Sequence, residues 1–116
     1  PILLASVDAV VHERYPDWEV VWYGHIGDGN LHLNILKPED LDIAEFKARC
    51  NTVSIDIFEA IQTLGGSVSA EHGVGTLKAP YLAYTKSESE IAAMRAVKAI
   101  FDPDGVLNPG KVFTTP

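Results

Sequence analysis

The sequence lacks several features that would assign it to a familiar class of protein. Cys50 is its only cysteine, so no internal disulfide bond can form, and we expect this side chain to be a small core residue. No apolar run approaches the ~20 residues of a membrane-spanning helix. Only nine residues are Lys or Arg, and they are scattered. Because nucleic-acid binding relies on a basic stripe, we expect neither a nucleic-acid partner nor a membrane span.

The composition that remains is typical of a globular domain. Apolar residues make up 47% and charged residues 22% of the 116 positions, and the net charge of −7 favours solubility. This length suggests one domain. The chain opens with Pro1 rather than Met, as an excised or processed piece would.

Hydrophobic periodicity predicts an α+β domain. Apolar residues recur at helical spacing over 2–14, 41–64 and 87–102, and Ser87 with Glu90 forms a capping-box pattern. Residues 18–26 and 30–36 have strand character, and a shorter strand is expected at the start of 67–75. A short helix should follow near Pro80, and a loop-rich tail should close the chain. On the last helix, Met94 and Phe101 are expected in the core.

This order resembles a ferredoxin-like antiparallel sheet with helices on one face and at least one strand missing. The sheet would then be completed by sequence that this chain lacks.

The stretch "GHIGDGNLH" places one histidine on each side of a flexible loop. If Asp28-Gly29 forms a two-residue turn, His25 lies directly opposite His32, on the same face of the hairpin. Two imidazoles this close can bind one metal ion, and Asn34 lies on the same face as His32. The alternative is a pair of solvated histidines, with Asp28 and Asn30 acting only as turn formers.

A second group of polar residues lies in "SAEHGVG". If the short strand joins the hairpin, Glu71 could complete a His-His-Glu metal set, which leaves coordination positions open. His72 could then accept a proton. The alternative is a helix N-terminal turn with a favourable acidic residue.

Three motifs together resemble a known family: "GHIGDGNLHLNI", "SAEHGVG" and "FDPDGVLNPGKVF". In this order and spacing they resemble the C-terminal domain of FAD-linked oxidases, the D-2-hydroxyacid dehydrogenases of the vanillyl-alcohol-oxidase superfamily. That group includes D-lactate dehydrogenase, the glycolate oxidase FAD subunit and D-2-hydroxyglutarate dehydrogenase. The resemblance implies transfer of a hydride from the substrate α-carbon to the flavin, giving a 2-oxoacid.

The resemblance also implies roles for individual residues. His25, His32 and Glu71 match the ligands of a divalent metal, often zinc, and His72 matches the residue that takes the substrate hydroxyl proton. Asn34 matches a substrate-contacting asparagine. Asn108, in "NPGK", matches a segment near the flavin.

We therefore expect residues 1–116 to be the C-terminal part of the family's substrate domain, without the FAD-binding domain. FAD would be bound mainly by that upstream domain, and the chain alone should be inactive. The implied partners are a small 2-hydroxyacid, the upstream domain and an electron acceptor, with a homodimer as one oligomeric state. The expected location is the cytoplasm, including the periphery of the inner membrane, or the mitochondrion in a eukaryote.

Two other functions fit the same residues. A flavin-free metal hydrolase would use the His-His-Glu set and should be active without a flavin domain. A non-catalytic ferredoxin-like binding module would keep its ligand and metal content after both hairpin histidines are replaced by alanine.

Overall fold

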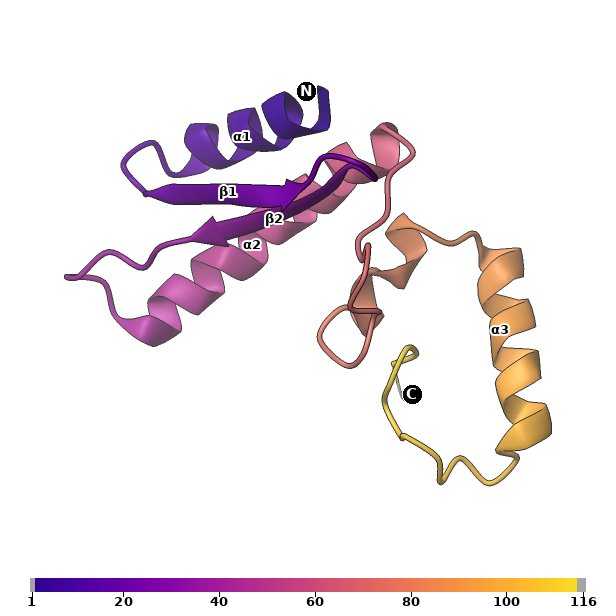
Figure 1. Ribbon diagram of the computed structural model, residues 1–116. Coiled ribbons are helices and arrows are strands. Elements are labelled where there is room, and N and C mark those ends of the chain that lie inside the picture. Colours follow the sequence, from indigo (N-terminus) through magenta and orange to yellow (C-terminus); the bar gives the residue numbers. More distant parts are fainter. Residues whose placement is uncertain (1, 115–116) are drawn as a thin grey trace. The chain divides into compact units, whose positions relative to one another are not determined.

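The computed structural model describes residues 2–114 and divides after Leu64 into two compact units (Figure 1). The first unit contains the predicted hairpin. The second contains the "SAEHGVG" loop and the last predicted helix. The α+β class predicted from the sequence is confirmed.

The first unit is a two-stranded sheet covered on one face by two helices. Its elements run in the order α1 (Ile2–Arg14), β1 (Val20–His25), β2 (Asn30–Ile35) and α2 (Ile43–Thr63). The core is formed by four buried side chains of α1 and α2: Val7, Val11, Val53 and Ile57. One face of the hairpin packs against them through Val20, Trp22, Leu33 and Ile35. The opposite face of the hairpin is therefore left for other contacts.

Polar contacts fix the two helices around this core. The Trp22 indole N–H donates to Asp8 of α1 at 3.1 Å, which ties the hairpin to that helix. The Tyr15 hydroxyl donates to the carbonyl oxygen of Arg49 at 2.9 Å, which ties the end of α1 to α2. Helix α2 begins at Asp42, whose carboxylate accepts hydrogen bonds from the backbone of Ala44 and Glu45.

The hairpin loop is longer than the sequence pattern predicted. Four residues, 26–29, connect the strands, and the Gly29 N–H donates to the carbonyl oxygen of His25 at 3.0 Å. Asp28 accepts from the Asn30 N–H at 3.1 Å, and Gly29 has a φ of +73°. These local bonds stabilise a wider turn, so the predicted two-residue turn at Asp28-Gly29 is wrong.

The second unit contains two helical elements and long connecting loops. They are the 3₁₀ helix η1 (Ala79–Tyr84), which is the short helix expected near Pro80 and has Pro80 as its second residue, and the helix α3 (Glu88–Phe101). The strand predicted at the start of 67–75 does not form among the described residues. Ser67 donates to the Ser69 carbonyl oxygen, and the Val68 N–H donates to the Thr85 hydroxyl. These bonds occupy groups that a strand would need for pairing.

Helix α3 has the predicted capping box, but its apolar side chains are more exposed than the sequence predicted. Ser87 accepts from the Glu90 N–H at 3.3 Å, and Glu90 accepts from the Ser87 N–H at 2.8 Å. None of its residues is fully buried, and Phe101 is 77% exposed, so the prediction of Phe101 as a core residue is wrong. Met94 is half-buried.

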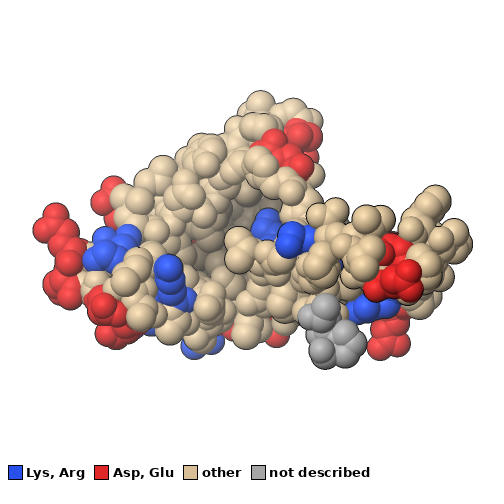
Figure 2. All heavy atoms as spheres, turned by 90° about the horizontal axis from the view of Figure 1, so that it is seen from below, with Lys and Arg blue, Asp and Glu red and all other residues tan. Residues whose placement is uncertain are grey.

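Two global properties follow from the described residues. Among residues 2–114, every helix is too short or too polar to cross a membrane. On the face shown in Figure 2, Lys and Arg side chains lie at several separate places among acidic ones.

Candidate functional site

The solvent-side face of the hairpin carries the histidines. In the observed register His25 pairs with Asn30, Tyr23 with His32, and Val21 with Asn34. Paired residues on antiparallel strands point to the same side, and side chains two positions apart share a face. These six residues therefore lie on the face opposite Val20 and Trp22.

The predicted direct pairing of His25 with His32 is wrong, but the two side chains still meet. The register differs from the predicted one by two residues, because the loop is two residues longer. A shift of two preserves the face on which each side chain lies. His25 and His32 become diagonal neighbours, with ring centroids 5.8 Å apart and ring planes tilted by 50°. A ring nitrogen of His25 lies within 4.8 Å of a ring nitrogen of His32.

Tyr23 is the direct cross-strand partner of His32. The two rings are stacked, with centroids 4.5 Å apart and planes 10° from parallel. Sequence analysis missed this contact, because it assumed a register in which Tyr23 and His32 are not paired. The available signal was the spacing, since Tyr23 lies two residues before His25 and must share its face.

The two asparagines of β2 differ in their surroundings. Asn30 is 8% exposed, and its amide nitrogen is buried without a hydrogen-bond partner among the described residues. Asn34 is exposed on the same face as His32. The Asp28 carboxylate accepts a hydrogen bond from the Asn30 N–H within the turn, which agrees with the interpretation of Asp28 as a turn former. Asn30 therefore offers a buried hydrogen-bond donor beside the histidines. The sequence pattern had predicted Asn30 only as a turn former.

Glu71 and His72 belong to an exposed loop of the second unit. The His72 Nε2 lies 3.4 Å from a Glu71 carboxylate oxygen. The loop is shaped by the Ser69 hydroxyl, which donates to the Gly73 carbonyl oxygen at 2.6 Å, and by Gly73 itself, which has a φ of +71°. This positive φ explains why glycine follows the Glu-His pair.

The tail of the chain is anchored to the same loop. The Val112 N–H donates to the Gly75 carbonyl oxygen at 2.8 Å, although Val112 adopts a φ of +67°. A positive φ is uncommon for a β-branched residue and marks a backbone that its surroundings hold in place. The "NPGKV" segment is therefore fixed relative to the loop that carries Glu71 and His72.

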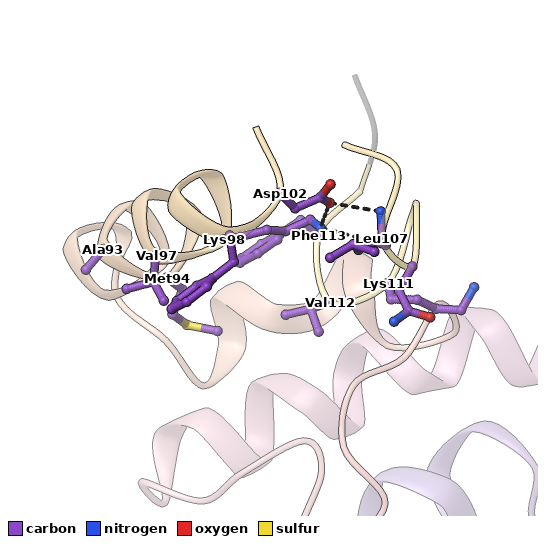
Figure 3. Close-up of a pocket in the computed structure, with 11 residues that line it drawn as sticks. Ala93, Met94, Val97, Lys98, Asp102, Leu107, Lys111, Val112 and Phe113 are labelled. Carbon is purple, nitrogen blue, oxygen red and sulfur yellow. Dashed lines mark hydrogen bonds and ion pairs between the residues drawn. The ribbon is translucent and has the colours of Figure 1, made fainter. Parts of the chain in front are cut away.

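Asn108 lies beside an open apolar groove of about 680 Å³ between α3 and the tail (Figure 3). Most of the lining is apolar, including Met94, Val97, Phe101 and Leu107. Asn108 itself has a φ of +46°, a conformation that asparagine adopts more readily than most residues. The groove accounts for the exposure of Phe101, because α3 turns its apolar stripe toward open space.

Asp102 organises the turn at the end of α3. Its carboxylate accepts from the Lys98 ammonium at 2.5 Å and from the Leu107 N–H at 3.1 Å (Figure 3). It also accepts from the Val106 N–H at 2.8 Å. The Lys98 hydrogen bond, with smaller contributions from the two backbone donors, lowers the pKa of Asp102 below its usual value. The side chain is only 3% exposed, so these bonds replace its hydration.

The donor set on the hairpin suits a divalent transition metal. Two imidazole nitrogens that bind one zinc ion at ~2.1 Å lie at most ~4.2 Å apart. The observed separation of at most 4.8 Å is within reach of a small ring rotation. Two imidazoles leave further positions for a carboxylate, substrate or water, so the residues fit a metal of this class.

The fold and the hairpin face together describe a small α+β domain with paired imidazoles on a glycine-rich turn. Residues 1–112 match the model of a family described as FAD linked oxidases, C-terminal domain, and the chain belongs to this family. This confirms the resemblance seen in the three sequence motifs.

Several relatives of this chain are named enzymes or enzyme subunits. The chain is 58% identical over 113 residues to a D-2-hydroxyglutarate dehydrogenase of Stutzerimonas stutzeri, covering 97% of this chain and 24% of that protein. It is 51% identical over 115 residues to the enzyme of the same name from Xanthomonas citri pv. viticola, and the match covers 99% of this chain and 24% of that protein. It is 43% identical over 97 residues to the glycolate oxidase subunit GlcD of Bacillus subtilis, covering 84% and 20%. The chain thus spans about a quarter of the length of the first two relatives.

Proposed function

We propose that this chain is the substrate- and metal-binding C-terminal part of an FAD-dependent D-2-hydroxyacid dehydrogenase. The family assignment and the names of the relatives support this reaction class. The structural observation that carries the proposal is the placement of His25 and His32 on one hairpin face, with ring nitrogens within 4.8 Å.

The proposed metal ligands are His25, His32 and Glu71. The two imidazoles come from paired strands of one hairpin, and Glu71 comes from a loop whose shape is held by the Ser69–Gly73 hydrogen bond. A carboxylate as third ligand would balance part of the charge of a divalent ion and leave positions open for substrate. Zinc is the proposed metal because two histidines and a carboxylate form a common zinc set.

Three further residues act on the substrate or lie beside the cofactor in this proposal. His72, adjacent to Glu71, accepts the proton of the substrate hydroxyl as a general base. Asn34 hydrogen-bonds the substrate through its amide, from the same face as the histidines. Asn108 would lie beside the flavin when FAD is bound.

FAD and the metal have distinct parts in this reaction. When bound, FAD supplies the acceptor for two electrons and the metal supplies a Lewis acid toward substrate oxygens. FAD would be held mainly by an upstream domain of the parent protein. The chain alone is therefore proposed to be inactive, and its substrate to be a small 2-hydroxyacid.

Metal content tests the proposal most directly. The purified chain, loaded with zinc and desalted, should hold close to one zinc per chain by mass spectrometry. The His25→Ala/His32→Ala variant should lose it. His12→Ala is the matched control, because His12 is an exposed histidine at the end of α1 and should leave metal content unchanged.

The results separate the candidate functions. Equal metal content in the parent and the double variant, or none in either, would contradict the proposed metal site. Hydrolysis of esters or amides by the zinc-loaded chain would favour a metal hydrolase. Oxidation of D-lactate, glycolate or D-2-hydroxyglutarate by the flavin-loaded parent protein, lost in the double variant, would support the dehydrogenase.

A further inference from the structure

We propose that Tyr23 is a positioning residue for His32, and that its stacked ring sets the affinity of the histidine pair for a divalent metal. The inference rests on the metal site of the proposed function. It assigns a role to a residue outside the His-His-Glu set. Tyr23 would act through His32 and would not itself bind the ion.

The contact is specific and is built into the sheet. Tyr23 and His32 are directly opposed in the ladder, and their rings are 10° from parallel with centroids 4.5 Å apart. His25 lies diagonally from His32, with centroids 5.8 Å apart. The His32 ring therefore has Tyr23 as its direct neighbour across the strands and His25 as its diagonal neighbour.

Stacking restricts the motion that matters for metal binding. The ring torsion of a histidine is broad and roughly two-fold, so an unrestrained imidazole directs its nitrogens over a wide range. A parallel ring at 4.5 Å blocks rotation of His32 about this torsion without using either ring nitrogen. The direction of these nitrogens is therefore set before the ion arrives, which lowers the entropy lost on binding.

Tyr23 has no comparable role in the fold. It is 54% exposed and lies on the face opposite the side chains that pack against the α1–α2 core. Substitutions at exposed positions outside a packed core usually change stability little. Substitution of Tyr23 should therefore change the site more than the fold.

The experiment compares zinc affinity in four chains by competition with a chromophoric chelator. Tyr23→Leu removes the aromatic ring, and Tyr23→Phe keeps the ring while removing the hydroxyl. Val21→Leu is the control, because Val21 is exposed on the same face of the same strand and pairs with Asn34 instead of a ligand. Circular dichroism confirms that all four are folded.

We expect Tyr23→Leu to weaken zinc binding about tenfold or more, the scale of effects seen when groups that orient metal ligands are removed. Tyr23→Phe should bind within about twofold of the parent, since stacking needs only the ring. Val21→Leu should match the parent. Without metal, the His32 ring-proton resonances should move downfield in Tyr23→Leu alone, because the shielding ring is lost.

Each remaining outcome is decisive. If the parent binds zinc and Tyr23→Leu binds equally well, the positioning role is wrong while the proposed metal site stands. If Tyr23→Phe is as weak as Tyr23→Leu, the hydroxyl and not the stack would be responsible, and the inference is overturned. If the parent binds no zinc, the proposed metal site fails, and this inference fails with it.

Discussion

Gly24 lies close to the backbone of the neighbouring strand. A Cβ atom at this position would be 2.1 Å from the Asn30 carbonyl oxygen, far inside contact distance, and the obstacle is backbone that cannot rotate away. Gly27, three residues later in the loop, has nothing within 4 Å of its would-be Cβ. One glycine is therefore required by packing, and the other is not.

We expect Gly24→Ala to destabilise the chain by about 2 kcal/mol or more, because overpacking against backbone forces the strands apart. The same displacement should weaken zinc binding, since His25 is the next residue. Thermal unfolding followed by circular dichroism measures the first effect. Gly27→Ala should leave thermal stability unchanged or raise it slightly. A loss of stability in Gly27→Ala as large as that in Gly24→Ala would contradict this explanation.

At the level of single residues, the sequence predicted which side chains share a face of the hairpin better than it predicted how they pair. The histidine pair could be predicted because residues seven apart, joined by a turn of two or four residues, end on the same face. The register of His25 and His32 could not be predicted, because the loop length depends on local hydrogen bonds such as the one that the Asn30 N–H donates to the Asp28 carboxylate. The burial of Asn30 and the stacking of Tyr23 depend on that register too. The union of Glu71 with the histidines stays a prediction.

Among the elements, α3 depends strongly on its first turn. Glu90 accepts from the Ser87 N–H, the Ser87 hydroxyl and the Lys86 ammonium. The Ser87 backbone hydrogen bond, followed by those from Lys86 and the Ser87 hydroxyl, lowers the pKa of Glu90 to about 2. A carboxyl with a lowered pKa stabilises the folded state above its unfolded pKa, and this contribution is lost as the pH falls through the folded value.

We therefore expect the start of α3 to loosen between about pH 4.5 and pH 2, with no change from this group above pH 5. Hydrogen exchange at the first α3 amides, corrected for the intrinsic pH dependence, measures the effect. Glu90→Gln should flatten the pH response, whereas Glu88→Gln, in the same turn, should keep it. A response that survives in Glu90→Gln would assign it to another carboxyl.

Removal of the cap itself gives a second prediction for this element. Ser87→Ala should destabilise α3 by about 1 kcal/mol, the usual cost of losing a serine N-cap. Amide exchange should rise in α3 and remain unchanged in α2, whose own cap is Asp42. Equal increases in both helices would mean that the cap stabilises the whole chain instead of one helix.

Helices were easier to predict than short strands for a physical reason. The helix pattern extends over many residues, and the caps at Asp42 and Ser87 mark where two helices begin. The stretch after Gly66 offered only four alternating residues. There the serine side chains and Thr85 supply hydrogen-bond partners that replace a neighbouring strand. Nothing in the local pattern distinguishes these two ways of satisfying the backbone.

At the scale of the whole molecule, the first unit has a packed apolar cluster of its own, although the second unit also buries Val68, Ala79 and Leu82. Val7, Val11, Val53 and Ile57 all lie within residues 2–64. A domain of about 60 residues is only marginally able to fold alone. This unit nevertheless has its own sheet, two helices and a shared apolar centre.

We expect residues 1–64 to fold without the second unit and to unfold cooperatively. Val53→Ala should destabilise this piece by about 2 kcal/mol, since it opens a cavity at a side chain that is 1% exposed. The isolated unit should bind zinc at least about tenfold more weakly than the whole chain, because the proposed ligand Glu71 is missing. Chemical denaturation and zinc titration test both. Equal affinity would exclude Glu71 as a ligand.

The family could be inferred from sequence because three motifs recur in a fixed order, and the match over residues 1–112 confirms it. The partner domain, the electron acceptor and the choice of 2-hydroxyacid stay proposals. The chain covers about a quarter of its first two relatives, and residues that select a substrate need not lie in that quarter.

The alternation of the hairpin links the stability of this chain to its chemistry. Leu33 and Ile35 must face the helices, and His32 and Asn34 must then face away. A slip of one residue would bury an imidazole and expose a leucine, whereas a slip of two would leave both faces intact. Variation in the loop by pairs of residues is thus compatible with both folding and the histidine pair. Selection for a packed interior alone would therefore keep positions 25 and 32 on a common side of the hairpin through long periods of sequence change.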